Sequence, residues 1–394
     1  MSLFDKFQPL ADAQASLGTR SPAAIATPIE AVLSPTRGVI DGREVLLAGT
    51  NNYLGLTYDP EVIAAASEAL SSLGSGTTGS RMANGSYQAH RALEHELAAA
   101  FGWAAAMVFS TGYQANLGTL SALAGKGDYL LIDADSHASI YDGARLSHAE
   151  TIRFRHNDPD NLDRRLTRLG ADASRALVVV EGLYSMLGDR PPLEAFVEVK
   201  ERHGAWLLVD EAHSFGVFGD RGLGLTESSG LLDRVDFVLG TFSKSLAGIG
   251  GFCVSPHPQL QLMRLASRPY IFTASPSPAT IAGTRVALRR VLQGQDLRAQ
   301  LQRNFTRLYA AAAELGYRLG SDVPGPVAAI ILGEREEALA LWRGLLEAGI
   351  YANLMIPPAT PSGLNLLRLS LSAAHSDADV DRIVAALAEM TVSA

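Results

Sequence analysis

Short apolar, β-branched runs alternate with amphipathic helical stretches through the middle of this 394-residue chain, and this alternation constrains its fold more than any other feature. Such alternation predicts a mainly parallel sheet of seven strands with helices on both faces, an α/β fold. The expected strands are 106–110, 129–133, 151–155, 176–181, 206–210, 237–240 and 251–255. The helical patterns between them cover 113–124, 138–146, 159–169 and 193–203.

The two ends of the chain do not show this alternation of strands and helices. We expect a large α/β domain over 51–275 and a smaller α+β domain over 276–394. The smaller domain would contain helices 277–294, 296–315 and 335–348 and short strands near 326–332 and 366–371. Residues 1–50 predict an arm, with a helix and then a strand pair around 38–47. The arm should pack with the C-terminal domain, because neither has much core alone.

Composition excludes several classes of protein. A formal net charge of −8 argues against a large nucleic-acid footprint, which needs clustered Lys and Arg. The single cysteine, Cys253, cannot form an intrachain disulfide and fits a reducing compartment. The N-terminus lacks the pattern of a signal peptide, and no apolar run approaches the roughly 18 residues of a membrane span. We therefore expect a soluble cytoplasmic protein without a transmembrane segment. Peripheral contact of the arm with the inner membrane is left open.

Polar and glycine residues gather where the expected strands end. Asp133, Glu181 and Asp210 are each the last residue of a strand, and Ser110 and Gly240 hold the same position in two others. The carboxyl ends of parallel strands meet at one edge of a sheet, and open α/β sheets bind their ligands there. We therefore expect the functional site at this edge.

The segment GTFSKSLAGIGG, residues 240–251, places a lysine directly after an apolar strand. If the ammonium group of Lys244 is buried, its pKa falls and the amine becomes a nucleophile that can form an imine. Thr241 and Ser243 add hydroxyl groups, and the glycines allow the backbone to approach a ligand closely. An exposed lysine in a surface turn is an equally weighted alternative.

The tetrad DEAH, residues 210–213, is also found in a group of helicases, where its carboxylates hold a metal ion on ATP. Such a role needs a nucleotide-binding loop, and the sequence contains no GxxxxGK[ST] segment. GSGTTG, residues 74–79, matches GxGxxG, but it follows a helical run where the dinucleotide fingerprint requires a strand. A helicase requires ATP, and the sequence shows no loop that would bind it, so the helicase interpretation is not supported.

Without ATP, Asp210 and His213 suit a different ligand. An aspartate at the end of a buried strand can pair with a pyridinium nitrogen, which pyridoxal phosphate requires in order to accept electrons. His213, three residues further on, can then bind the neighbouring phenolic oxygen. A metal site that also includes His137 is the alternative, but the sequence shows no tight ligand cluster.

Other candidate residues follow the remaining strands. His137 could stack on an aromatic ring or simply cap a helix, and Ser185 could reach the same ring. Gly112 and Tyr113 begin a helix after a strand, where free N–H groups and the helix dipole favour a phosphate. Arg368 lies within an apolar strand, so it needs an anionic partner: either a substrate carboxylate or an internal salt bridge.

The order of these motifs resembles one enzyme family, the α-oxoamine synthases. These are fold-type I pyridoxal phosphate enzymes that join an amino acid to an acyl thioester with loss of carbon dioxide. The resemblance runs from about 51 to 375. Its markers are NNYLGL (51–56), STGYQAN (110–116), DSHASIYDG (135–143), EGLYSMLGD (181–189), VDEAHSFGVFGDRGLG (209–224), GTFSKS (240–245) and RPYIFTAS (268–275).

The resemblance assigns a role to each candidate residue. Lys244 would bind the cofactor as an imine, His137 would stack on its ring, and Asp210 would pair with the ring nitrogen. His213, helped by Ser185, would bind the phenolic oxygen. The cofactor phosphate would be held by Gly112, Tyr113, Thr241 and Ser243. Family active sites form at a homodimer interface, so the phosphate in the partner subunit would be reached by Thr273 and Ser275. The substrate carboxylate would lie between Asn52 and Arg368. No metal is implied.

Within the family, four segments resemble the bacterial branch that condenses L-serine with a palmitoyl thioester to give 3-ketodihydrosphingosine. These segments are GSGTTGSRMANGS (74–86), RFRHN (153–157), RPYIFTAS (268–275) and PPATPSG (357–363). The acyl carrier implied is coenzyme A or an acyl carrier protein. Members of this branch often carry an arginine immediately before PPATP, where this chain has Ile356. A relative that uses glycine or alanine with another acyl group is therefore the alternative.

Overall fold

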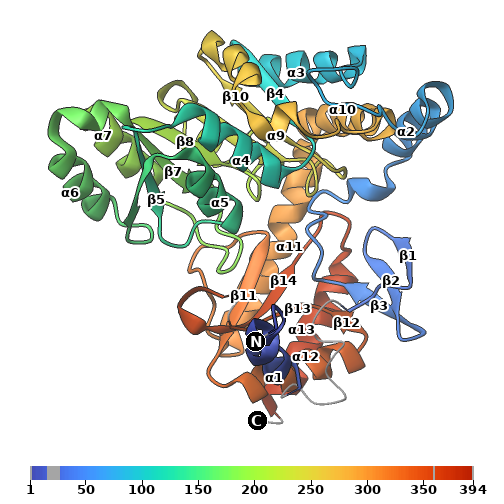
Figure 1. Cartoon of the computed structure of the whole chain (residues 1–394). Helices are drawn as coiled ribbons and strands as arrows, with labels where there is room; N and C mark the ends of the chain where they lie inside the picture. Colours follow the sequence, from blue (N-terminus) through green and yellow to red (C-terminus); the bar gives the residue numbers. More distant parts are fainter. Residues whose placement is uncertain (1, 16–26, 358–359, 393–394) are drawn as a thin grey trace.

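The alternating pattern of the central segment folds into one seven-stranded sheet in the computed structural model, which describes residues 2–15, 27–357 and 360–392 (Figure 1). Its strands are β4 (Ala105–Phe109), β5 (Tyr129–Asp133), β6 (Glu150–Phe154), β7 (Ala176–Glu181), β8 (Trp206–Asp210), β9 (Phe237–Thr241) and β10 (Gly251–Ser255). All seven were predicted; β4 and β6 begin and end one residue earlier than expected, and β9 ends one residue later. The predicted fold class is confirmed.

The strand order of this sheet is β4-β10-β9-β8-β7-β5-β6. Only β10 runs antiparallel to its neighbours, so the carboxyl ends of the other strands lie at one edge. The register places Glu181 directly beside Asp210. The polar residues that end these strands are therefore brought to one edge, as the sequence predicts.

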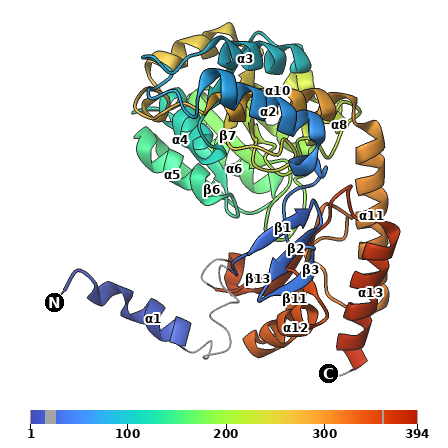
Figure 2. The same cartoon turned by 90° about the vertical axis from the view of Figure 1, so that its right-hand side faces the viewer.

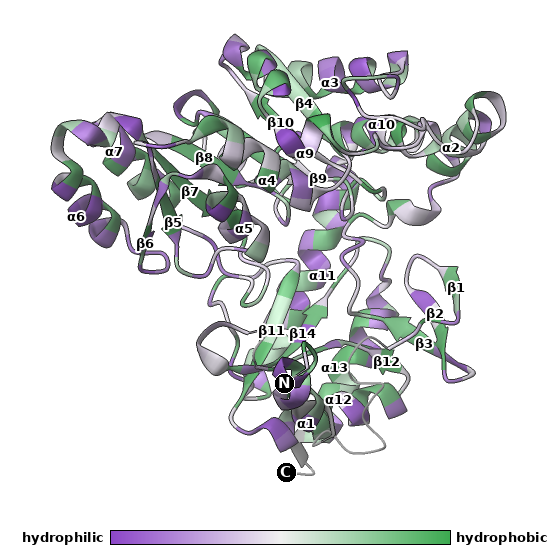
Figure 3. Ribbon diagram, in the orientation of Figure 1, coloured by the Kyte–Doolittle hydropathy of each residue, from purple (hydrophilic) through white to green (hydrophobic). Residues whose placement is uncertain are grey.

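Alternate residues along each strand separate into two hydrophobic cores, one on each face of the sheet. On one face, Leu130 and Val179 pack with α4 (Gly112–Leu123) and α5 (Ala138–Ser147). On the other face, Leu131 and Val178 belong to a larger core. That core is completed by α2 (Pro60–Leu73), α3 (Gln88–Phe101), α6 (Pro159–Leu169), α7 (Leu193–His203) and α10 (Pro278–Gln293). The strand β4 is coloured as hydrophobic along its length in Figure 3.

Two smaller sheets lie below the large one in Figure 1. The first is formed by β1 (Ala31–Ser34), β2 (Arg37–Ile40), β3 (Arg43–Leu47) and β12 (Ile350–Tyr351), and the second by β11 (Val327–Leu332), β14 (Asn365–Ser370) and β13 (Asn353–Met355). β3 pairs with β12 in parallel, and both share a core with α12 (Arg335–Glu347) and α13 (Asp377–Val392). Figure 2 shows α11 (Gln295–Glu314) beside α13, with α1 (Gln8–Ala15) projecting away.

The division into an arm (1–50), a large domain (51–275) and a C-terminal domain (276–394) stays a prediction. α10 and the first part of α11 contribute apolar side chains to the core of the large sheet. Within the described ranges, no helix is both long enough and apolar enough to cross a membrane.

Candidate active site

A cavity of about 290 Å³ opens at the carboxyl edge of the large sheet. It brings together most of the predicted residues, namely Gly112, Tyr113, His137, Asp210, His213, Thr241, Ser243 and Lys244. A larger cavity of about 980 Å³, between the 217–229 segment and α11, contains none of them. In the described part of the chain, no three His, Cys, Asp or Glu side chains lie close enough together to hold a metal ion.

Lys244 follows β9 and projects into this cavity; the residue is partly exposed, but its amine is buried. Its ammonium group makes no hydrogen bond or ion pair with any described residue. Burial lowers the pKa of Lys244 to about 8, although the carboxylates of Asp210 and Glu181 act in the opposite direction. At neutral pH about a tenth of such amines is therefore unprotonated and nucleophilic.

Asp210 ends β8 and is buried opposite the start of α4. One carboxylate oxygen accepts a hydrogen bond from the backbone N–H of Ala212 at 2.9 Å, and the other accepts from Nδ2 of Asn116 at 2.7 Å. Both oxygens therefore have a donor, and the carboxylate can pair with a cationic ring nitrogen. The role of Asn116 was missed in the sequence, although it lies four residues after Gly112 and so on the same face of α4.

His137 both caps a helix and faces the cavity. Its Nδ1 accepts from the backbone N–H of Ser139 at 3.2 Å at the start of α5, and its own backbone N–H donates to Oε1 of Glu181 at 2.5 Å. Burial lowers the pKa of His137, and the Lys244 ammonium adds to that effect. The Tyr113 ring lies edge-on, 6.3 Å away between centroids. The imidazole is therefore neutral, and the backbone of His137 is held in place by Glu181.

Glu181, one of the residues at the ends of the expected strands, also lines this cavity, although no role was predicted for it. Burial and the adjacent Asp210 carboxylate raise the pKa of Glu181 well above its usual value. The available sequence signal was its position as the last residue of an expected strand; its register with Asp210 is seen only in the structure.

His213 is held by a tyrosine from the N-terminal part of the chain. Its Nδ1 lies 2.7 Å from the hydroxyl oxygen of Tyr53, and burial lowers the pKa of His213 well below its usual range. Burial also raises the pKa of Tyr53 to about 12, so both groups are neutral at physiological pH. Tyr53 belongs to the NNYLGL segment, from which only Asn52 was selected.

Arg368, on β14, is 5% exposed, and burial lowers its pKa. Its Nη2 donates to Oδ1 of Asn51 at 2.5 Å, whereas its Nε has no acceptor among the described residues. No carboxylate in that part of the chain pairs with it, so the internal salt bridge considered as an alternative is not found there. Asn52 donates to Thr57 at 2.8 Å and has an unpaired, buried Oδ1.

Asn52 and Arg368 lie outside the cavity lining, and so do three further predicted residues. Ser185 is half-buried in the turn after β7. Thr273 accepts from Nε2 of Gln114 at 3.1 Å. The hydroxyl of Ser275 lies 2.7 Å from that of Thr77 and donates to the carbonyl of Gly85 at 2.7 Å, so it is tied to the glycine-rich loop of its own chain. Their roles toward a cofactor stay predictions.

Comparison with known proteins places this geometry in a family. The family model for aminotransferase class I and II matches residues 43–387. A serine palmitoyltransferase from Caulobacter vibrioides is 53% identical over 99% of this chain and 96% of that protein. The chain belongs to the α-oxoamine synthase branch of this aminotransferase family. The resemblance deduced from the ordered motifs is therefore confirmed.

Solved structures agree with this assignment. A serine palmitoyltransferase from Sphingomonas wittichii superposes with a TM-score of 0.97 at 51% identity and covers 100% of this chain and 99% of its own. Another solved structure, of SPT with PLP as an internal aldimine, gives the same TM-score at 46% identity over 100% of this chain and 99% of its own. The prediction of pyridoxal phosphate as the family cofactor is confirmed.

Proposed function

We propose that this chain condenses L-serine with palmitoyl-coenzyme A and releases 3-ketodihydrosphingosine, coenzyme A and carbon dioxide, the first step of sphingolipid synthesis. The observation that carries the proposal is Lys244, a buried amine with its pKa lowered to about 8, in one cavity with Asp210. The serine palmitoyltransferases at 51–53% identity over nearly the whole chain support this substrate pair over others.

The cavity suits pyridoxal phosphate. At its phosphate end, the first N–H groups of α4 have no acceptor within the helix, and the hydroxyls of Thr241 and Ser243 lie 2.7 Å apart. A Cβ atom at Gly112 would come within 2.8 Å of the Thr241 side chain, so this close approach requires glycine. Thr241, Ser243, Gly112 and Tyr113 would hold the phosphate, while Asp210 would pair with the ring nitrogen. Once bound, the cofactor withdraws electrons from the substrate Cα.

The remaining residues bind, orient and move protons. Lys244 supplies the amine that holds the cofactor, and in its free form it takes the Cα proton of the substrate and later returns one. The neutral His137 would pack against the ring of the cofactor, and His213, with Ser185, would donate to its phenolic oxygen. Tyr53 fixes the orientation of His213 through its 2.7 Å contact.

Arg368 and Asn52 would bind the carboxylate of serine. A buried guanidinium with a free Nε and no carboxylate partner among the described residues is a site for an anion, because an unpaired buried charge is costly. The adjacent unpaired Oδ1 of Asn52 can accept from the substrate ammonium or hydroxyl. Ile356 lies near the end of β13 and would influence how strictly serine is preferred.

We infer further that the enzyme is a cytoplasmic homodimer whose active sites include residues of both subunits. Exposed apolar side chains precede Thr273 in the chain: Leu262 is 65% exposed, Leu265 68% and Phe272 72%. Apolar surface this close to a functional segment supports a subunit interface. Thr273 and Ser275 would then contribute to the phosphate site of the partner subunit.

The deciding experiment is mass spectrometry of the lipids formed from palmitoyl-coenzyme A with serine, glycine or alanine in parallel. We expect the 3-ketodihydrosphingosine mass with serine alone. Product with glycine or alanine only would show that the chain uses another amino acid than serine, as other members of the same family do. Lys244→Ala should abolish turnover and covalent attachment of the cofactor, and retained turnover would contradict the proposed role of Lys244.

A further inference from the structure

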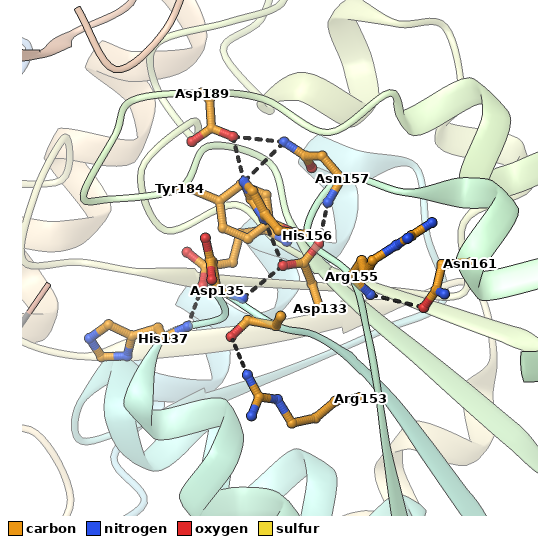
Figure 4. A network of polar contacts seen from close by, with 12 residues as sticks. Asp133, Asp135, His137, Arg153, Arg155, His156, Asn157, Asn161, Tyr184 and Asp189 are labelled. Carbon is orange, nitrogen blue, oxygen red and sulfur yellow. Dashed lines mark hydrogen bonds and ion pairs between the residues drawn. The ribbon is translucent and has the colours of Figure 1, made fainter. Parts of the chain in front are cut away.

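Beside the cavity, one histidine is held between two aspartates (Figure 4). Nδ1 of His156 lies 2.7 Å from Oδ1 of Asp133, and Nε2 lies 2.7 Å from Oδ2 of Asp189. A neutral imidazole has one N–H group and cannot donate to both carboxylates, whereas an imidazolium can. Burial alone lowers the pKa of His156, but the hydrogen bonds and charges of the two aspartates outweigh it and raise the pKa to about 10.

Further hydrogen bonds hold these aspartates, although Oδ1 of Asp189 has no partner among the described residues. Asp133 is fully buried and accepts from the backbone N–H groups of Asn157 and Asp135, both at 2.9 Å. Nδ2 of Asn157 donates to Oδ2 of Asp189 at 2.7 Å. The ring of Tyr184 lies edge-on to His156, with 4.5 Å between centroids. His156 therefore has one defined position, fixed by charge, hydrogen bonds and packing.

The network joins two segments that carry proposed cofactor residues. Asp133 ends β5 and begins the His137 loop, which we define as residues 133–137. Asp189 closes the Ser185 turn, residues 182–189, in which the Tyr184 N–H donates to the Asp189 carbonyl at 2.9 Å. His156 comes from a third segment, directly after β6, and it contacts both. Figure 4 shows His137 at the end of the loop that starts from Asp133.

We propose that His156 is a positioning residue: its imidazolium ties the His137 loop to the Ser185 turn and so sets where His137 and Ser185 meet the cofactor ring. This inference rests on the function proposed above. The backbone of His137 is fixed at the far end of its loop by Glu181, at 2.5 Å, so the loop is held at both ends. His156 does not line the cavity and would act through these two segments.

Removal of the cation changes the balance of charge in this network. Asp133, His156 and Asp189 together carry one net negative charge when His156 is an imidazolium. In His156→Gln the side-chain amide can still donate to one carboxylate, but two negative charges remain with no cation between them. Like charges in a buried position repel, so the loop and the turn should separate.

The test uses the holoenzyme and two readouts besides activity: the visible circular dichroism of bound pyridoxal phosphate, and its dissociation constant. His156→Gln should lose at least about half of the visible signal and weaken cofactor binding about tenfold, as expected when the support of a binding group is removed. The KM for palmitoyl-coenzyme A should stay within about twofold, because Asp133, His156 and Asp189 do not line the cavity. Asp189→Asn, which keeps an acceptor for Nε2, should change both readouts in the same direction and less.

The matched control is His203→Gln. His203 is also partly buried and lies 2.9 Å from one aspartate, Asp163, but on α6 and α7, away from the cavity. This variant should melt at a lower temperature with an unchanged cofactor signal. Equal signals in His156→Gln and wild type would overturn the inference, as would an equal loss in His203→Gln. If His156→Gln does not fold, Asp189→Asn decides by the same readouts. A wild-type chain that binds no pyridoxal phosphate would instead overturn the proposed function.

Discussion

Burial of the amine lowers the pKa of Lys244. Because this effect comes from the protein itself, it can be measured without the cofactor. The chain has four lysines, and in the cofactor-free protein we expect Lys244 to be acylated by an amine-selective reagent with a midpoint near pH 8. An ordinary lysine, with pKa about 10.4, is only about 0.4% neutral at that pH. Peptide mass spectrometry across pH 6–11 measures this, with the exposed Lys126 as internal reference.

The direction in which the pKa of Lys244 changes when the charge of Asp210 is removed can also be predicted. Because the Asp210 carboxylate raises the pKa of Lys244, Asp210→Asn should move the acylation midpoint of Lys244 to lower pH. A midpoint above about pH 9.5 in the wild-type chain, or a shift to higher pH in the variant, would contradict the buried position of the amine.

Asn116 provides a second prediction at the scale of one residue. Its amide is one of the two donors to the Asp210 carboxylate, and a hydrogen bond to a charged group contributes about 1.5–3 kcal/mol. Asn116→Ala should therefore weaken pyridoxal phosphate binding by roughly tenfold or more, measured by fluorescence titration of the cofactor-free protein. Asn304→Ala is the control, because its amide is equally buried but donates to the carbonyls of Ser372 and His375, away from the cavity. Unchanged binding in Asn116→Ala would contradict a role of Asn116 in cofactor binding.

At this scale the sequence identified the residues that follow the strands and missed those that support them. Lys244, Asp210 and His213 were found because each ends or follows a recognisable apolar strand. Tyr53 and Asn116 support these groups through contacts between segments far apart in the chain: Tyr53 reaches His213 across 160 positions. No local pattern encodes such a contact.

At the scale of the elements, the strands could be predicted because burial on both faces requires continuous apolar runs, which the sequence displays directly. Pairing between distant segments could not: the parallel contact of β3 with β12 joins Leu46 to Ile350. The change after Ser275, where long helices replace the strand–helix alternation, was also visible locally in the sequence. α10 follows that change, yet packs on α2 and shares the core of the large sheet, because the apolar face of a helix does not specify its partner.

The junction of α4 with β9 yields a prediction about elements. The Cβ of Gly112→Ala would meet the Thr241 side chain at 2.8 Å, which is closer than real Cβ contacts allow. The start of α4 must then move away from the end of β9 and widen the proposed phosphate site. We expect pyridoxal phosphate to bind about tenfold more weakly, measured by equilibrium dialysis. Gly76→Ala, where the added Cβ meets no atom within 4 Å, should bind it normally. Equal affinities in both variants would contradict the phosphate site.

At the scale of the whole molecule, the site joins three distant parts of the chain. Asn51 and Tyr53 come from the segment that follows the first small sheet, Lys244 from the large sheet, and Arg368 from β14 of the second small sheet. Arg368 contacts Asn51 at 2.5 Å, across 317 positions. The position of the serine carboxylate relative to Lys244 therefore depends on how these parts pack together, and the sequence alone names the residues without their arrangement.

The proposed homodimer gives the last prediction. Phe272, 72% exposed, lies next to Thr273, whose hydroxyl we expect at the phosphate of the partner subunit. Phe272→Glu would place a charge in an apolar interface and should shift the protein from dimer to monomer in sedimentation velocity, with loss of turnover. Leu146→Glu, at a 52% exposed position of α5, should stay dimeric and active. A wild-type monomer with full turnover would show that each chain completes its own phosphate site, and the roles proposed for Thr273 and Ser275 would then be wrong.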